Sequence, residues 1–131
     1  QITFKVIVDV TIDMPDLDLK STLWTKESEI EELDKIDIGI MPLPDDKWSR
    51  GKCGFKGIQY MALEKPTVMS PVGVNVDIIE HGVNGYLAKQ NDIIDFSKGI
   101  DWSLKNLKRE NMEENLINLK KKFSKTNFRL F

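Results

Sequence analysis

The sequence contains one cysteine and one histidine. An internal disulfide needs two cysteines and is therefore excluded, and the shortage of both residue types leaves little for a zinc site. No apolar run approaches the ~18 residues that a membrane-spanning helix needs, and no signal peptide is visible. We therefore expect a cytoplasmic protein.

An excess of charge of one sign is also lacking. The chain has 19 Lys and Arg against 21 Asp and Glu, a formal net charge of -2. Because the basic and acidic residues nearly cancel, the chain has no general attraction to nucleic acid or to an anionic membrane. Any anion site must therefore be local. With 131 residues, 40% of them hydrophobic, the chain can form one domain with a core. It begins in a strand pattern without a methionine, so we expect a fragment of a longer protein.

Strand-like and helix-like segments alternate along the chain. Runs of β-branched and apolar residues predict strands at 2–10, 19–24, 36–41, 67–70 and 86–88. Helical spacing and capping residues predict helices beginning near 25, 55, 75 and 92. Such alternation implies a parallel, doubly wound, Rossmann-like α/β sheet with helices on both faces.

Apolar stripes predict which helix faces are buried. In the first helix the stripe is Ile30 and Leu33. In the closing helices one stripe is Ile93, Phe96, Ile100 and Leu104, and the other is Met112, Leu116, Leu119 and Phe123. The segment between the third strand and the glycine turn, 45–49, reads as an exposed loop.

The most informative segment joins the third strand to the helix that begins near Phe55. Gly51 and Gly54 lie in this turn, and the side chains of Arg50, Lys52 and Lys56 surround the helix start. The unpaired N–H groups and the positive dipole end of a helix favour an anion, and glycine lets the backbone approach it closely. The pattern predicts a phosphate site. The alternative is a plain loop with solvated lysines.

A second glycine-containing loop, Pro71 to Asn75, follows the next predicted strand. In doubly wound sheets, ligands bind beyond the carboxyl ends of the strands. Both loops should therefore lie at that edge, where Gly73 and Asn75 permit close approach to a ligand, although a plain turn is the alternative reading.

Between Asp37 and Leu87 the sequence resembles the carboxyl-terminal domain of the GT-B glycosyltransferases, in particular the large retaining family four. The ordered motifs that carry the resemblance are Gln59-Tyr60-Met61-Ala62, Lys65-Pro66-Thr67-Val68, Ser70-Pro71-Val72-Gly73-Val74-Asn75 and Ile78-Ile79-Glu80-His81-Gly82-Val83-Asn84-Gly85-Tyr86-Leu87. The resemblance implies that residues 1–131 form a single nucleotide-sugar-binding domain. The acceptor-binding N-terminal domain and the first strand would then be missing from this piece.

The resemblance also implies the reaction. A sugar passes from a nucleotide diphosphate sugar to an acceptor hydroxyl with retention of configuration, and no metal or other cofactor is required. We expect a role in surface polysaccharide or lipopolysaccharide synthesis, with peripheral association of the full-length protein at the inner face of the membrane. The alternatives are a degenerate nucleotide-sugar-binding module without transfer activity and a non-enzymatic interaction module of response-regulator type.

By resemblance, the expected diphosphate-binding residues are Gly51, Lys52, Gly54, Phe55 and Lys56, and those expected at the ribose or sugar are Gln59, Gly73 and Asn75. The family typically carries two glutamates where this chain has Gly51 and Gln59. The amide of Gln59 can still hydrogen-bond ribose hydroxyls, but Gly51 offers no carboxylate. The missing carboxylate is the reason for the alternative of a degenerate binding module without transfer activity. The resemblance leaves the catalytic residue unknown and implies no metal ligand.

Several other residues have a simple structural interpretation. Cys53 reads as a small packing residue and His81 as part of a turn. Trp24 and Trp102 read as packing residues, whereas Trp48 lies in a predicted exposed loop and could meet a partner domain or the donor. The lysines at 120–122 read as a solvated helix face.

Overall fold

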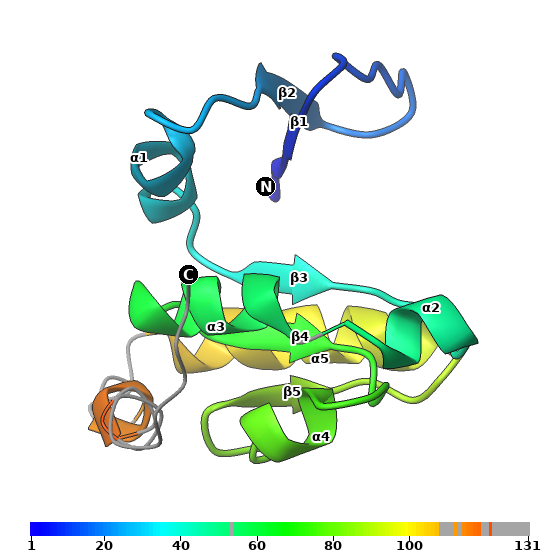
Figure 1. The fold of residues 1–131 in the computed structure, drawn as a ribbon, viewed down its shortest axis with the longest axis vertical. Coiled ribbons are helices and arrows are strands. Elements are labelled where there is room, and N and C mark those ends of the chain that lie inside the picture. The colour runs from blue at the N-terminus through cyan, green and yellow to red at the C-terminus, as the bar shows by residue number, and fades with distance from the viewer. Residues whose placement is uncertain (53, 108–111, 113, 119–120, 122–131) are drawn as a thin grey trace. The chain divides into compact units, whose positions relative to one another are not determined.

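The computed structural model describes residues 1–52, 54–107, 112, 114–118 and 121. The chain divides into two compact units, Gln1–Ile36 and Asp37–Phe131, and each is described by itself. Figure 1 colours the first unit blue to cyan and the second from cyan onwards. The expectation of one domain over residues 1–131 stays a prediction.

The first unit consists of a parallel strand pair and a short helix. Strands β1 (Phe4–Val8) and β2 (Leu19–Leu23) pair along their whole length. Helix α1 (Glu29–Asp34) begins later than predicted, because residues up to Ser28 form a preceding turn. The hydroxyl of Thr25 accepts the Ser28 N–H at 3.1 Å, so Thr25 stabilises the turn rather than capping the helix itself.

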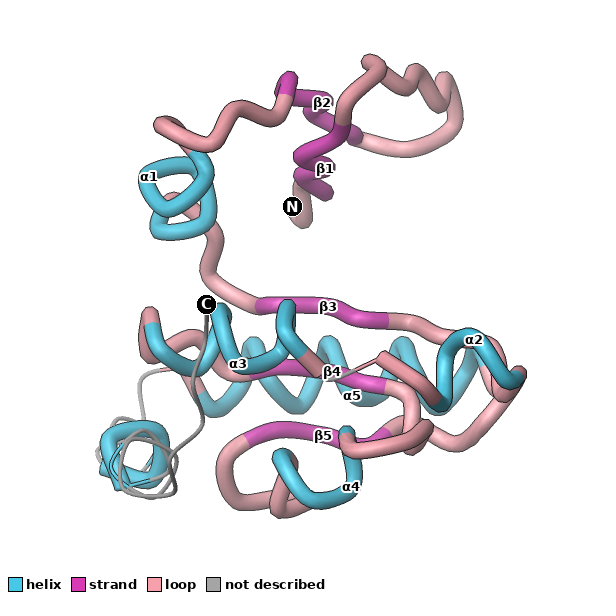
Figure 2. Tube along the Cα trace, in the orientation of Figure 1, coloured by secondary structure: helices cyan, strands magenta, loops and turns pink. Residues whose placement is uncertain are grey.

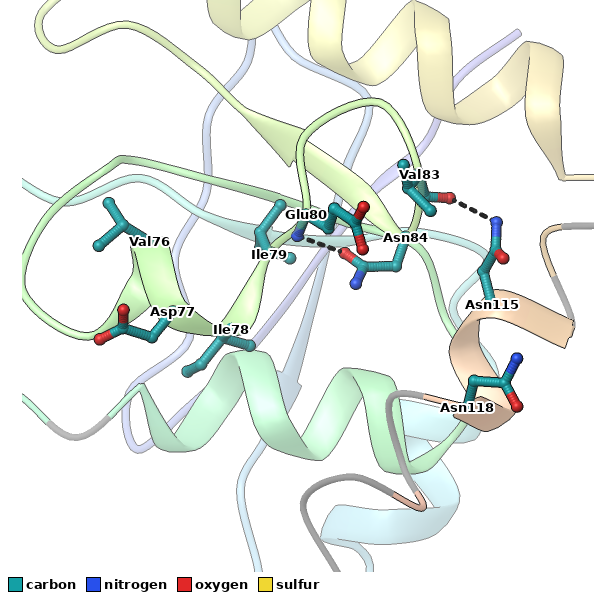
Figure 3. Close-up of a pocket in the computed structure, with 9 residues that line it drawn as sticks. All are labelled: Val76, Asp77, Ile78, Ile79, Glu80, Val83, Asn84, Asn115 and Asn118. Atoms are coloured by element: carbon teal, nitrogen blue, oxygen red, sulfur yellow. Dashed lines mark hydrogen bonds between the residues drawn. The ribbon is translucent and has the colours of Figure 1, made fainter.

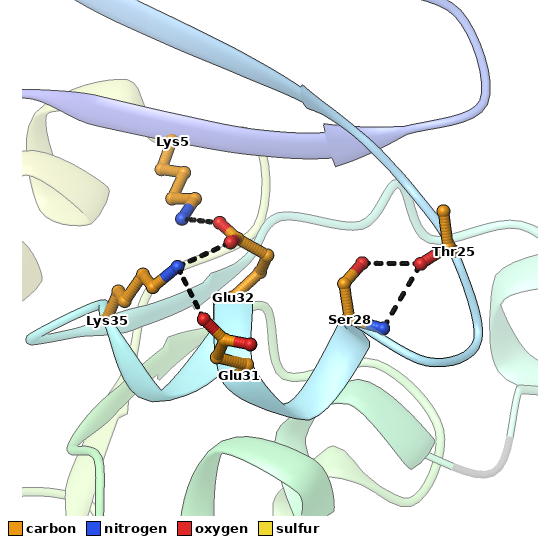
Figure 4. Close-up of polar contacts among 6 residues, drawn as sticks. All are labelled: Lys5, Thr25, Ser28, Glu31, Glu32 and Lys35. Carbon is orange, nitrogen blue, oxygen red and sulfur yellow. Dashed lines mark hydrogen bonds and ion pairs between the residues drawn. The ribbon is translucent and has the colours of Figure 1, made fainter.

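Charged side chains hold α1 to the strand pair (Figure 4). Lys5 on β1 forms an ion pair with Glu32 on α1, and Lys35 reaches Glu32 at 2.6 Å. The hydrogen bond from Lys35, followed by that from Lys5, lowers the pKa of the Glu32 carboxyl. Leu33 is buried as predicted, but Ile30 is 55% exposed, so the two-residue stripe was wrong for Ile30.

The second unit is built on a three-stranded parallel sheet (Figure 2). Strands β3 (Gly39–Met41), β4 (Thr67–Met69) and β5 (Gly85–Leu87) lie in the order β3-β4-β5. Thr67 lies opposite both Gly39 and Gly85 in register. All three residues of β4 are fully buried, as expected for the central strand of a parallel sheet.

Helices cover both faces of this sheet, which confirms the predicted α/β architecture. Neighbouring residues of a strand point to opposite faces. Gly57 of α3 (Phe55–Ala62) lies against Met69, and Gly99 of α5 (Ile93–Asn106) lies against Val68. Two further helices, α2 (Lys47–Arg50) and α4 (Asn75–Ile78), are single turns near the strand ends.

The predicted stripe of α5 was wrong for Ile93 and Leu104, which are 86% and 39% exposed, whereas Phe96 and Ile100 are half-buried. The fully buried residues of α5 are Asp95, Gly99, Ser103 and Asn106. A Cβ atom at Gly99 would lie 2.7 Å from both Val68 Cγ1 and Tyr86 Cδ1, so the helix packs too closely on the sheet for larger side chains there. Close packing, rather than the apolar stripe, therefore sets the orientation of α5.

A core cluster of the second unit consists of apolar residues from β3, α3, β4, the end of α4 and the helical residues 112 and 114–118, namely Met41, Ile58, Met61, Met69, Ile78, Ile79, Met112 and Leu116. Met112 and Leu116 belong to the second predicted stripe, and both are buried. Leu119 and Phe123 of that stripe lie outside the described residues. Among the helices that the structure describes, none is long and apolar enough to cross a membrane.

Candidate functional site

The segment after β3 contains a short helix where the sequence predicted an exposed loop. Helix α2 is capped by Asp46, whose carboxylate accepts the Ser49 N–H at 2.7 Å. The hydrogen bonds from Ser49 lower the pKa of Asp46, with a smaller contribution from the charge of Lys52. Gly51 ends α2, and its N–H donates to the carbonyl of Trp48 at 3.2 Å. The N–H of Gly51 is thus engaged within the protein.

Arg50 does not stand free beside the glycine turn. Its guanidinium binds the Asp45 carboxylate twice, with Nε at 2.5 Å from Oδ1 and Nη2 at 3.0 Å from Oδ2. This pairing lowers the pKa of Asp45 and raises that of Arg50. The charge of Arg50 is therefore balanced within its own loop by Asp45.

Gly54 forms the entrance to α3. It adopts a left-handed conformation with φ of 67° and is buried. A Cβ atom here would lie 2.4 Å from Ile78 Cδ1 and 3.3 Å from Asn75 Oδ1, so only glycine fits. Glycine has no side chain with which to cap α3, and the helix begins with the exposed residues Phe55 and Lys56. This geometry suits close approach of an anion to the first turn.

The second predicted loop packs directly on the first. Gly73 is also left-handed, with φ of 56°, and a Cβ atom there would lie 2.8 Å from the carbonyl oxygen of Arg50. Together with the contact between Gly54 and Asn75, this brings the two glycine loops into one structure at the carboxyl edge of the sheet. The sequence had predicted that both loops lie at this edge.

Hydrogen bonds join the strand ends beneath the loops. The Leu43 N–H donates to Ser70 Oγ at 2.9 Å, and Gln90 Nε2 donates to the Leu43 carbonyl at 3.1 Å. Asn75 Nδ2 donates to the Ser70 carbonyl at 2.9 Å. Sequence reasoning missed Ser70 and Gln90 as supports, since their only signal is a position just after a strand.

The remaining predicted site residues differ in accessibility. Lys52 and Lys56 are exposed, and Lys56 Nζ lies 5.8 Å from the centre of the Phe55 ring. Gln59 is half-buried, one turn further along α3 than Phe55. Asn75 is only 1% exposed. Cys53 lies outside the described residues.

The residues given a structural interpretation behave in different ways. His81 Nδ1 accepts the Leu87 N–H at 3.1 Å, and its ring lies 4.5 Å from that of Tyr86. Trp102 is half-buried and packs against the core cluster, whereas Trp24 and Trp48 are 42% and 79% exposed. The structural reading therefore fits His81 and Trp102 better than Trp24.

A cavity of about 490 Å³ lies between α4, the turn at Asn84 and the helical residues 114–118 (Figure 3). Its charged lining residues are Asp77 and Glu80, and the described lining includes no lysine or arginine. Such a surface does not suit a phosphate. Within the described part of the chain, no cluster of three His, Cys, Asp or Glu residues could hold a metal ion.

Comparison with known proteins gives two matches. Residues 21–122 match the model of the family described as "Glycosyl transferases group 1". The fold is similar to that of HepE from Anabaena, solved in complex with UDP, with a TM-score of 0.55 and 15% sequence identity. The similarity covers 83% of this chain but 32% of HepE, so the chain spans about a third of that relative's length. No curated protein matches the sequence.

Proposed function

The chain belongs to the group 1 glycosyl transferase family, and from that premise we propose that it forms the donor-binding domain of a retaining GT-B glycosyltransferase. In the proposed reaction, a sugar passes from a nucleoside diphosphate sugar to an acceptor hydroxyl with retention of configuration. An acceptor-binding domain elsewhere in the full-length protein completes the site. The expected setting, surface polysaccharide or lipopolysaccharide synthesis at the cytoplasmic face of a membrane, is part of the proposal.

The observation that carries the proposal is the left-handed, buried Gly54 at the start of α3. Its left-handed backbone turns the chain into α3 where no larger residue fits, and the first turn of the helix then begins with the exposed residues Phe55 and Lys56. The N–H groups there and the positive end of the helix dipole provide partners for a diphosphate. We assign the diphosphate to the backbone of Gly54 and Phe55, with Lys52 or Lys56 as the counter-charge.

The other predicted residues take supporting roles in this proposal. Because its N–H is already bonded to α2, Gly51 acts as a spacer that keeps the approach open. Gln59, on the same helix, is assigned to the ribose hydroxyls, and Gly73 permits close approach from the second loop. A helix N-terminus with lysines can neutralise a leaving diphosphate, which is why the proposal needs no metal ion.

The test is a titration of the isotope-labelled chain with UDP, GDP and ADP, followed by NMR. We expect the amide shifts to concentrate at Gly54, Phe55 and Gly73, and the strongest ligand to identify the base of the donor. Shifts that concentrate at Asp77 and Glu80 instead, or no shift at millimolar ligand, would count against a donor site at the glycine loops. Transfer activity is then measured on the full-length protein, where binding without turnover would favour a module that has lost transfer.

A further inference from the structure

Asn75 lies at the junction of the two glycine loops and is 1% exposed. Its Nδ2 donates to the Ser70 carbonyl at 2.9 Å, and its backbone N–H donates to the Val72 carbonyl at 3.2 Å. Its backbone carbonyl accepts the Ile79 N–H at 3.1 Å. These groups are engaged within the protein, so Asn75 is poorly placed to contact a bound donor directly.

The side chain of Asn75 instead faces Gly54. Its Oδ1 lies 3.3 Å from the position that a Cβ atom of Gly54 would occupy, and Val74 Cγ2 and Ile78 Cδ1 lie at 3.2 Å and 2.4 Å from the same point. These three residues form a wall behind the entrance to α3. The wall is anchored, because Ser70, to which Asn75 is bonded, also accepts the Leu43 N–H at the end of β3.

A glycine populates positive and negative φ about equally, so its own chemistry does not select the left-handed state. The selection must come from the residues packed around it. We propose that Asn75 is a positioning residue: it holds Gly54 in the left-handed conformation that points the first N–H groups of α3 toward the donor, and it does not touch the donor. The link to affinity rests on the proposed function. The link to the conformation of Gly54 does not.

The chain offers a matched control for this proposal. Asn84 is also a buried asparagine, 3% exposed, and its Oδ1 accepts the Glu80 N–H at 2.9 Å in a turn that borders the cavity of Figure 3. Asn75→Ala and Asn84→Ala therefore each remove one hydrogen bond between a buried asparagine side chain and the backbone. They differ in whether the removed side chain packs on Gly54.

Two readouts are compared for Asn75→Ala and Asn84→Ala. In the ligand-free chain, we expect Asn75→Ala to shift the amide resonances of Gly54 and Phe55 and to change the Gly54 coupling that reports φ. Its affinity for UDP should fall by about tenfold or more, whereas Asn84→Ala, with a similar loss of Tm, should keep its affinity within about twofold of the parent chain.

Two results would overturn the positioning role. One is an equal loss of affinity in the two variants. The other is unchanged Gly54 resonances in ligand-free Asn75→Ala, and if affinity is lost in that case, Asn75 is a direct ligand. If Asn75→Ala does not fold, Ile78→Val, which shortens the side chain facing Gly54, must produce the same shifts. If the parent chain does not bind UDP, GDP or ADP, the result counts against the proposed function alone. The Gly54 resonances of the ligand-free variants still test whether Asn75 holds the conformation of Gly54.

Discussion

Gly51 and Gly54 lie in the same glycine turn, but only one of the two positions excludes a residue with a Cβ atom. Gly51 has φ of -79°, and a Cβ atom there would lie 3.5 Å from the Trp48 carbonyl oxygen, an ordinary contact. Gly54 has φ of 67°, and a Cβ atom there would overlap Ile78. The backbone requires glycine at position 54 but not at position 51.

We therefore predict that Gly54→Ala lowers the free energy of unfolding by about 2–4 kcal/mol, the combined scale of left-handed strain and overpacking. Gly51→Ala should change it by less than about 0.5 kcal/mol, as for a tolerated surface substitution. Urea unfolding of both variants measures the difference. Similar free energies for the two would contradict the assignment of glycine 54 as the constrained position.

Glu64 is a second residue with an unusual backbone, since its φ is 59° without the freedom of glycine. It follows α3, where the Lys65 N–H donates to the Tyr60 carbonyl at 2.9 Å and closes the helix end. Glycine is the preferred residue in such a position. Glu64→Gly should therefore raise the free energy of unfolding by about 0.5–1 kcal/mol through relief of strain.

Thermal unfolding of Glu64→Gly and of Glu64→Ala separates backbone strain from side-chain effects. Alanine also removes the carboxylate but keeps the Cβ atom that causes the strain. A rise in Tm for glycine alone supports the strain argument. An equal rise for alanine would assign the effect to the lost side chain.

At the scale of elements, a carboxylate fixes α5 to the end of β5. Asp95 accepts the Lys89 N–H at 2.7 Å and the Tyr86 hydroxyl at 2.9 Å, and its own N–H donates to the capping residue Asp92. The bond from the Lys89 N–H, followed by that from Tyr86, lowers the pKa of Asp95. Burial, followed by the bond to Asp95, raises the pKa of Tyr86.

This lowered pKa predicts a contribution to acid sensitivity. Because the folded chain binds the Asp95 proton less readily than the unfolded chain, the stabilisation is complete above the ordinary aspartate pKa of about 3.9 and is lost as the pH falls through the lower, folded value. Asp95→Asn should therefore lose stability less steeply than the parent chain between about pH 5 and about pH 3. Tyr86→Phe removes one hydrogen-bond donor to Asp95, so its loss of stability with falling pH should lie between those of the parent chain and Asp95→Asn. The free energy of unfolding is measured by urea at each pH, and the same dependence on pH in all three proteins would contradict the prediction.

The elements also show where sequence patterns were sufficient. Residues 55–62 form the predicted helix, because Pro66 and the glycine turn bound an apolar pattern that has one consistent period. The burial of α5 was not predictable in the same way. Its apolar residues fall on a stripe, yet the side that packs is selected by the smallness of Gly99 and by the bonds of Asp95 to another element.

At the scale of the whole molecule, the net charge of -2 gives no long-range attraction for a nucleotide. Binding at the glycine loops must depend on nearby cations, and Arg50 is already paired with Asp45. We predict that Lys56→Ala lowers the affinity for UDP by about tenfold, the scale of a charge-assisted hydrogen bond. Lys105→Ala, which removes a lysine paired with Asp101 on α5, serves as the control and should have no such effect.

Titrations at low and high salt extend this test. The affinity of the parent chain should fall as the salt concentration rises, because exposed charges are screened. Lys56→Ala should show a weaker dependence on salt than Lys105→Ala. Equal dependence in both variants would place Lys56 among the solvated surface lysines.

The sequence by itself determined the alternation of β3, β4 and β5 with α3, α4 and α5, though not α2, and the presence of both glycine loops at one edge of the sheet. These features depend on local patterns: apolar periodicity, and the glycines and prolines that interrupt it. Only the tertiary structure decided that Arg50 pairs with Asp45, that Gly73 packs on the Arg50 backbone and that Asn75 is buried against Gly54. The last two contacts join residues some twenty positions apart, and contacts of that kind are set by packing in three dimensions, which no local pattern encodes.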